Sequence, residues 1–304
     1  PNIWLKGNAW EIKAKMNSEF PDLTTMVNYR DDSNPMNIIL GNTQLRNIHY
    51  YDIEGGKTFE GKKHSRLNIN TGYHQTDNAV AYSLVFDKQT GVSTVQPISV
   101  NGNYRIDLGI GYTRPLDKKE KLSIDNQASF NYNHNVDMAM VQGTTQSQRS
   151  IVNNWKISNV LKLNYRPDDN YEFTLHGGGT YYLIKSQREG FSNIHAGDYN
   201  IGMNAQITLP WKLQLTTDLT MFARRGYQLS EMNTTDWIWN AQLSRSFINK
   251  KLLVKLQGFD MLRQLSNTQY LMNAQGRTET WNNSIPRYVM LSLSWRFNVN
   301  PKKK

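Results

Sequence analysis

The side chains that could bind a metal ion or act in acid–base catalysis are scattered along this sequence. Its six histidines, at positions 49, 64, 74, 134, 176 and 195, lack the spacing of metal ligands. The chain has no cysteine, which excludes disulfides, thiolate metal sites and cysteine nucleophiles. It also contains no nucleophile elbow and no phosphate-binding loop. We therefore expect no enzymatic activity, no metal site and no cofactor.

The charged side chains are many and evenly distributed. The chain carries 35 Lys and Arg against 25 Asp and Glu, a net charge of +10. Only Lys302 to Lys304 form a basic run, and we assign residues 299 to 304 to a basic tail. Because the other cations are dispersed, we expect no nucleic acid partner. A basic interior, or basic loops that face an anionic surface, explains the charge better.

Alternation of apolar and polar residues, with the period of a β-strand, determines where these charges lie. In the last segment, Arg287 to Phe297, one face is apolar and the other is mostly polar. The same pattern recurs in segments of roughly nine to thirteen residues, about the length needed to cross a bilayer when tilted. These segments are Leu67 to Tyr73, Val80 to Phe86, Tyr104 to Tyr112, Leu122 to Tyr132, Trp155 to Tyr165, Tyr171 to Leu183, Tyr199 to Thr208, Leu213 to Met221, Trp237 to Phe247 and Leu252 to Gln257.

Some positions break the alternation. Asn126, Asn159 and Arg245 fall on the apolar faces, and Arg245 could reach water if it lies near a membrane interface. Residues 3 to 16 form a twelfth strand-like segment, whose apolar phase shifts near its middle. This shift predicts a β-bulge.

The predicted connections alternate strictly between short and long. The short ones are His74 to Asn78, Thr113 to Lys121, Arg166 to Asn170, Leu209 to Lys212 and Ile248 to Lys251, and the long ones are 17 to 63, 87 to 103, 134 to 154, 188 to 198, 225 to 236 and 265 to 285. This alternation is typical of an up-and-down membrane barrel with short periplasmic turns and long extracellular loops. A soluble sandwich or β-helix would lack this segregation of loop lengths or would show a sequence repeat. We predict an all-β, antiparallel, up-and-down transmembrane β-barrel of about twelve strands.

In such a barrel, function lies in the lumen and in the loops. Trp237, Tyr270 and Trp281 could contact a glycan or peptide from the loops. The last strand closes the barrel and directs its assembly through Val289, Leu291, Leu293, Trp295 and Phe297. The charged residues expected to face the lumen either line a solute path, contact a plug or simply solvate the interior; they are Arg105, Asp107, Asp125, Lys156, Lys162, Glu172, Asp218, Lys255 and Arg296.

Three segments resemble TonB-dependent receptor-like outer-membrane barrel proteins of Bacteroidota. Asp31 to Leu45 resembles the family's SNPL…GNP stretch, although Thr43 stands where the family usually has Pro. Pro97 to Tyr104 resembles its PVNVNGN step. Arg287 to Phe297 resembles its closing strand, although seven further residues follow Phe297. Together the motifs cover roughly residues 17 to 298.

The resemblance implies a bacterial outer-membrane protein whose whole barrel has about twenty-two strands. Residues 1 to 298 would then be the C-terminal part of that barrel, and a complete twelve-stranded barrel is the alternative. No positions match the family's TonB box or plug. The implied function is uptake of a bulky nutrient (glycan, peptide or metal chelate), and the alternative is a scaffold for surface lipoproteins, adhesion or secretion. The implied partners are outer-membrane lipid and lipopolysaccharide, a plug and an N-terminal barrel half on the same or a separate chain, TonB and a surface lipoprotein.

Overall fold

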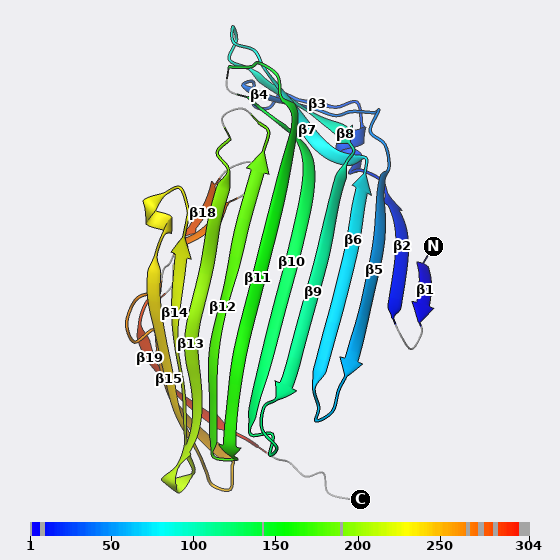
Figure 1. Ribbon diagram of the computed structural model, residues 1–304. Coiled ribbons are helices and arrows are strands. Elements are labelled where there is room, and N and C mark those ends of the chain that lie inside the picture. Colours follow the sequence, from blue (N-terminus) through cyan, green and yellow to red (C-terminus); the bar gives the residue numbers. More distant parts are fainter. Residues whose placement is uncertain are drawn as a thin grey trace, which may run out of the picture.

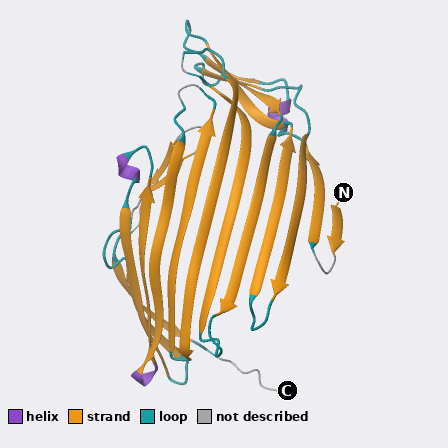
Figure 2. Cartoon of the chain, viewed as in Figure 1, coloured by secondary structure: helices purple, strands orange, loops and turns teal. Residues whose placement is uncertain are grey.

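The computed structural model of the chain describes residues 2–6, 10–141, 143–188, 191–265, 268–272, 277–281 and 285–297. The predicted basic tail, 299–304, lies outside these residues. The described residues form a thirteen-stranded sheet, a four-stranded sheet and a two-stranded hairpin. Almost every element is a strand, and the large sheet is long and strongly curved (Figures 1 and 2).

All neighbouring strands of the large sheet run antiparallel. This confirms the predicted fold class. In order across the sheet, the strands are β1 (Asn2–Lys6), β2 (Glu11–Glu19), β5 (Ile48–Glu60), β6 (Arg66–Asp77), β9 (Asn103–Pro115), β10 (Leu122–Ala139), β11 (Gln148–Asp168), β12 (Tyr171–Ser186), β13 (Ile194–Leu209), β14 (Leu213–Arg225), β15 (Thr235–Phe247), β16 (Leu252–Phe259) and β19 (Tyr288–Trp295).

Short and long connections alternate along this sheet, as predicted. The short ones lie at the lower end in Figure 1 and comprise residues 61–65, 116–121, 169–170, 210–212 and 248–251, and β1 and β2 are also joined at that end, where Lys6 pairs with Glu11. The long ones join strands at the upper end: β2 to β5, β6 to β9, β10 to β11, β12 to β13, β14 to β15 and β16 to β19. The last strand descends to the lower end, because Trp295 pairs with Leu252, the first residue after a short turn.

Three strand predictions were wrong. The segment from residue 3 to residue 16 is not one bulged strand, because it contributes to two antiparallel strands, β1 and β2, in which Lys6 pairs with Glu11. The phase shift falls between these two strands. Strand β5 was missed, since Gly55 and Lys57 occupy its apolar face and interrupt the alternation. Val80 to Phe86 was assigned to the barrel, but it lies in the four-stranded sheet.

The last two errors cancelled in the strand count, so the directions of the later strands were predicted correctly. The direction of β6 was not: it ascends, and its end at Asp77 lies at the upper end of the sheet. The predicted periplasmic turn at His74 to Asn78 is therefore wrong. Asn78 does change the chain direction, with φ of 57° and its backbone N–H bonded to Asn101 Oδ1 at 2.6 Å, but it leads into the upper sheet.

The four-stranded sheet, the upper sheet, consists of β3 (Arg30–Asp31), β4 (Asn37–Leu40), β8 (Ser93–Val100) and β7 (Ala79–Phe86) in that order. Its β4–β8 pair is parallel. This pairing brings two of the family-like motifs together, since Asn42 Nδ2 donates to the carbonyl of Pro97 at 2.9 Å. The sheet packs on the upper part of β10 and β11 through an apolar cluster that includes Ala81, Val100 and Val136.

The two faces of the large sheet differ in chemistry. On its apolar face, large side chains such as Leu108, Ile157, Leu175, Ile201 and Met203 are exposed. Paired residues share a face in an antiparallel sheet, so the register keeps this face continuous over neighbouring strands. The opposite, polar face carries the charged side chains. A sheet with one exposed apolar face and one polar face fits a wall between lipid and water.

The two asparagines that break the apolar face bond to each other. Asn126 Nδ2 donates to Asn159 Oδ1 at 3.0 Å, and Asn159 Nδ2 donates back to Asn126 Oδ1 at 3.2 Å. Each amide thereby satisfies the other where no water is available. Arg245 lies two residues from the lower end of β15, and its guanidinium is 4.8 Å from the ring centre of Phe247. From this position near the strand end, the Arg245 side chain could reach water at a membrane interface.

Helical structure is limited to short turns. The α-helix α1 (Leu23–Met26) is capped by Asp22, whose side chain accepts from the backbone N–H of Thr24 at 2.8 Å. Two 3-10 turns, η1 (Pro210–Lys212) and η2 (Ser230–Met232), lie in connections. None of the helices in the described part of the chain is long and apolar enough to span a bilayer.

Candidate functional site

The polar face of the large sheet is the candidate site, and its charged side chains are organised into pairs. The most connected group, the upper polar cluster, consists of Asp52, His74, Arg105, Asp107 and Asn131 on β5, β6, β9 and β10. His74 Nδ1 lies 2.7 Å from Asp52 Oδ1, and His74 Nε2 lies 3.4 Å from Asp107 Oδ2. Asp107 also accepts from Arg105 Nε at 2.6 Å and from the amide of Asn131. Two carboxylates thus flank one imidazole near the upper end of the sheet.

Only two of the five residues of this cluster were among the predicted lumen-facing residues. Arg105 and Asp107 were expected on the polar face, and the structure places them there. Asp52 was missed along with β5, and His74 had been assigned to a turn. The pairing of Asp52 with His74 in the register of β5 and β6 could be found only after β5 was recognised.

Three more predicted residues lie on the polar face lower down or farther along the sheet. Asp125 accepts from Thr113 Oγ1 at 2.8 Å. Lys162 stands directly opposite Asp125 in the register of β10 and β11. Lys156 Nζ lies 5.9 Å from the ring centre of Tyr182 on β12. These groups are spread over the wall and do not converge on one point.

The remaining predicted residues lie near the lower end or on later strands. Glu172 is opposite Gln206, and Lys255 is opposite Ser244 and Ser292. The Asp218 carboxylate accepts hydrogen bonds from Asn240 Nδ2, at 3.3 Å to each oxygen. Arg296 follows the end of β19, and its backbone N–H donates to the carbonyl of Lys251 at 2.8 Å.

A groove without charged side chains separates the upper polar cluster from the Asp125 and Lys162 pair. It has a volume of about 520 Å³ and crosses β5, β6, β9, β10 and β11. Its floor includes Gly109 and Gly111, where no side chain fills the wall. Hydroxyl and amide side chains line it, namely Thr58, Asn68, Asn70, Gln127, Ser129 and Ser158. Such a surface offers hydrogen bonds to a neutral polar solute or to a protein element placed in the lumen.

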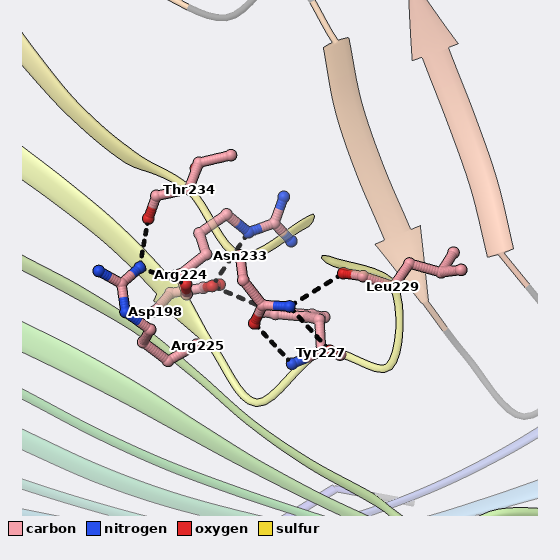
Figure 3. Close-up of polar contacts among 7 residues, drawn as sticks. All are labelled: Asp198, Arg224, Arg225, Tyr227, Leu229, Asn233 and Thr234. Atoms are coloured by element: carbon pink, nitrogen blue, oxygen red, sulfur yellow. Dashed lines mark hydrogen bonds and ion pairs between the residues drawn. The ribbon is translucent and has the colours of Figure 1, made fainter. Parts of the chain in front are cut away.

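At the upper rim, residues 226–234, the rim loop, are fixed to the wall by a compact polar network (Figure 3). Tyr227 Oη donates to Asp198 Oδ1 at 2.8 Å, and Arg224 Nε donates to the same oxygen at 3.2 Å. The Arg224 guanidinium lies 4.5 Å from the ring centre of Tyr227. Within the loop, Asn233 Nδ2 donates to the carbonyls of Tyr227 and Leu229. The loop is therefore ordered by its own side chains.

Two further features stabilise the contact of the rim loop with β13. Burial, and then the neighbouring Asp198 carboxylate, raise the pKa of Tyr227 to about 12, so that its hydroxyl stays a donor. Gly226 has φ of 81°, and a Cβ atom there would lie 2.2 Å from the backbone carbonyl oxygen of His195. Only glycine allows this close approach of loop and strand.

The predicted loop contacts have a different placement from the one expected. Trp237 is the third residue of β15 and shares the apolar face with its partner Met221, so it is not a loop residue. Its side chain is 40% exposed. The backbones of Tyr270 and Trp281 lie in the hairpin of β17 (Thr268–Met272) and β18 (Arg277–Trp281), and their side chains lie outside the described part of the structure.

Four of the five predicted assembly residues form the apolar face of β19, and the fifth, Phe297, follows the end of the strand. Val289, Leu291 and Leu293 are 71%, 64% and 67% exposed. Trp295 and Phe297 are exposed too, with ring centres 6.2 Å apart. Strand β19 pairs only with β16 and so forms one free edge of the described sheet, and β1 forms the other. The role of these residues in assembly stays a prediction.

Among the described residues, potential metal ligands do not cluster on either face of the large sheet. Among residues 2–6, 10–141, 143–188, 191–265, 268–272, 277–281 and 285–297, no group of three or more His, Asp or Glu side chains could hold a metal ion. The upper polar cluster has one imidazole between two carboxylates, and its members are paired with each other.

Comparison with known proteins supports the membrane interpretation of this sheet. The model of the outer membrane protein beta-barrel family matches residues 142–295. No curated protein sequence matches the chain. Among solved structures, the chain is similar to the copper transporter OprC, with a TM-score of 0.51 and 10% identity, over 85% of this chain and 42% of the transporter.

A second solved structure with a similar sheet is a mutant of the ferric enterobactin receptor PfeA from Pseudomonas aeruginosa in complex with enterobactin. The TM-score is 0.49 and the identity 12%, over 91% of this chain and 45% of the receptor. The chain thus spans less than half the length of both proteins. At 10% identity, the similarity to OprC concerns the fold and not the transported substance.

Proposed function

Because the chain belongs to the outer membrane protein beta-barrel family, we propose that its sheet is one part of a wide outer-membrane barrel that takes up a bulky nutrient. The family places the protein in the bacterial outer membrane, with the apolar face toward lipid and the polar face toward the lumen. The long connections then lie outside the cell and the short ones in the periplasm.

The direction of the two edge strands carries this proposal. Strand β1 descends, because its last residue, Lys6, pairs with Glu11 at the lower end of β2, and β19 also descends to the lower end. If these thirteen strands closed on themselves, β1 and β19 would pair in parallel. Bacterial barrels close with antiparallel pairs and an even number of strands. Antiparallel closure therefore takes an odd number of additional strands between β19 and β1.

A barrel of that size has room for a solute path. Barrels of about eight strands are filled by their own side chains, whereas those of about sixteen to eighteen leave an aqueous channel and those of about twenty-two hold a plug. The polar face described above is suited to line such a space, since it alternates charged pairs with the uncharged groove. We propose a TonB-energised receptor of the twenty-two-strand class, in which a plug contacts this wall.

The proposed solute is a glycan, a peptide or a metal chelate. The uncharged groove favours a neutral polar solute, because amide and hydroxyl groups exchange hydrogen bonds with water and solute alike. The protein would act by binding and passage and not by chemical conversion of the solute.

Uptake assays in the native cell test the proposal. Labelled oligosaccharides, peptides and ferric chelates are offered to wild-type cells, to cells that lack the gene and to cells that lack TonB. We expect gene loss and TonB loss to abolish uptake of the same class. Uptake of all three classes that is unaffected by gene loss would contradict a transport role and favour a scaffold role.

A wall variant then tests the lumen. Asp107→Asn removes the charge that joins Arg105, His74 and Asn131, and we expect it to alter uptake while the barrel still folds. Lys118→Gln, in a short turn away from the lumen wall, is the matched control. Equal uptake by the two variants would argue against a role for the upper polar cluster.

A further inference from the structure

Two cations and a histidine end adjacent strands on the apolar side of the wall. Lys185 is one residue from the end of β12, His195 is the second residue of β13, and Arg225 is the last residue of β14. Each shares the face of the lipid-facing residues two positions away in its strand, such as Leu183 for Lys185 and Ala223 for Arg225. All three are exposed. We call this group the outer cation arc.

Aromatic rings lie directly below and beside the arc. His195 is in one register row with Leu183, Trp155 and Tyr132. The rings of Tyr132 and Trp155 are 5.1 Å apart, and Lys185 Nζ lies 5.9 Å from the centre of the Trp155 ring. Amphipathic rings gather at the level of lipid headgroups. The arc therefore stands at the headgroup level of the outer leaflet.

The members of the arc are held in place by their neighbours. Arg225 Nη1 donates to the carbonyl of Thr234 at 2.6 Å, and its Nη2 donates to Thr235 Oγ1 at 2.6 Å (Figure 3 shows the first of these). The Tyr181 hydroxyl lies 3.1 Å from His195 Nδ1. These contacts fix the guanidinium and the imidazole at the strand ends before any ligand binds.

The sign of the charge distinguishes this face from the lumen face. From β10 to β14, the described lipid-facing residues at this level include His134, Lys185, His195 and Arg225 and no carboxylate. The lumen face of the same strands carries Asp125, Glu172 and Asp198 beside its cations. The lysine and the arginine, with no carboxylate beside them, attract anions from the membrane side, and the two histidines can donate hydrogen bonds.

We propose that the outer cation arc binds the phosphate of a phosphorylated glycolipid in the outer leaflet. The Arg225 guanidinium and the Lys185 ammonium, which lie two strands apart, each pair with phosphate oxygens of the headgroup, and the acyl chains lie on the apolar face below, beside Tyr181 and Ile157. Arginine recognises phosphate through paired N–H donors, and lysine adds a point charge. The proposal depends on membrane placement and not on transport, so either can fail without the other.

Native mass spectrometry of the protein in detergent tests this inference, with bis-phosphorylated lipid A as the probe. The double variant Lys185→Gln, Arg225→Gln removes two charges, and we expect binding about 30-fold weaker, from roughly 1 kcal/mol per cation at a charged membrane surface. The double variant Lys118→Gln, Lys119→Gln is the matched control, since it removes the same charge in the short turn at residues 116–121. We expect its binding to equal that of the wild type.

Two further arms identify the recognised group. Lipid A without phosphates should bind wild-type protein as weakly as phosphorylated lipid A binds the arc variant. Inorganic phosphate should neither bind comparably alone nor displace lipid A, because it lacks the acyl chains. A heat-modifiable gel band verifies folding, and Lys185→Gln with Arg225→Lys replaces the double variant if that band is lost. Unchanged binding by a folded arc variant, or equal binding of dephosphorylated lipid A, would overturn the proposal.

Discussion

The large sheet and the upper sheet are both made of alternating strands, but their alternation has different causes. In the large sheet, one face meets lipid and the other meets water, so the period persists over long strands such as β10 and β11. In the upper sheet, Ala81 is buried against Val100 and Val136, whereas Tyr82 on the next position is 52% exposed. The same period thus describes a small core in water. Alternation alone identifies a strand and does not tell which two environments it separates.

The largest expected effect follows from this difference. Leu161→Arg places a charge on the lipid face of β11, and we expect a loss of about 2–4 kcal/mol in the free energy of unfolding. Val85→Arg makes a similar change near the end of β7, at a side chain that is 44% exposed, where water solvates the charge, and should cost less than about 0.5 kcal/mol. Urea unfolding in lipid vesicles, followed by tryptophan fluorescence, measures both. Equal losses would mean that β11 does not face lipid.

A smaller effect concerns the asparagine pair inside the lipid face. Asn126→Ala leaves the amide of Asn159 without its partner and should cost about 1–3 kcal/mol in the same unfolding assay. The double variant Asn126→Leu, Asn159→Leu removes both polar groups and should be nearly neutral. If the single and double variants lose the same stability, the two amides do not depend on each other.

The smallest effect is local and lies in water, at the rim loop. Tyr227→Phe removes the hydrogen bond to Asp198 and should raise the open population of the rim loop about tenfold, since a bond to a charged acceptor contributes roughly 1.5 kcal/mol. A nitroxide at Ser230→Cys reports this as increased mobility. Global unfolding should not change.

The same residue gives a pH dependence. Its folded pKa of about 12 lies above the ordinary value of 10.0, so the stabilisation is complete below pH 10 and is lost as pH rises through 12. The nitroxide should therefore become mobile over that range in the wild-type loop, and Tyr227→Phe should show no such transition. A pH-independent wild-type loop would contradict the role of the hydroxyl.

Strands with one uniformly apolar face and one polar face were predicted correctly from the sequence. A strand whose apolar face contains a charged residue was missed. Strands β9 to β16 were all predicted, because their apolar residues recur at every second position. Strand β5 was missed because Lys57 lies on its lipid face, where its ammonium group is 4.4 Å from the ring centre of Phe59. Because β5 was missed, the contact between Asp52 and His74 could not be predicted. Interfacial cations of this kind look like breaks in a pattern until the strand end is known.

The upper sheet could not be predicted from the sequence, for a different reason. Its parallel pair joins β4 to β8, segments that are far apart in the sequence, and local periodicity contains no information about such a pairing. The rim loop is similar, because the bond from Tyr227 to Asp198 depends on the register of β13 and β14. Residues 31–45 and 97–104 were both identified as family-like motifs, but the sequence did not show that they are neighbours. In the structure they contact each other, since the Asn42 side chain donates to the carbonyl of Pro97.

The directions of β5 and β6 give the most direct test that the large sheet is a wall between lipid and lumen. The chain has no native cysteine, so single cysteines can be placed without background labelling. Lys63→Cys lies in the connection between β5 and β6, and Thr90→Cys lies in the connection between β7 and β8. With a membrane-impermeant thiol reagent on intact cells, we predict labelling at position 90 and not at position 63. Labelling at position 63, or its absence at position 90 in a folded protein, would contradict the assigned strand directions and the wall that they build.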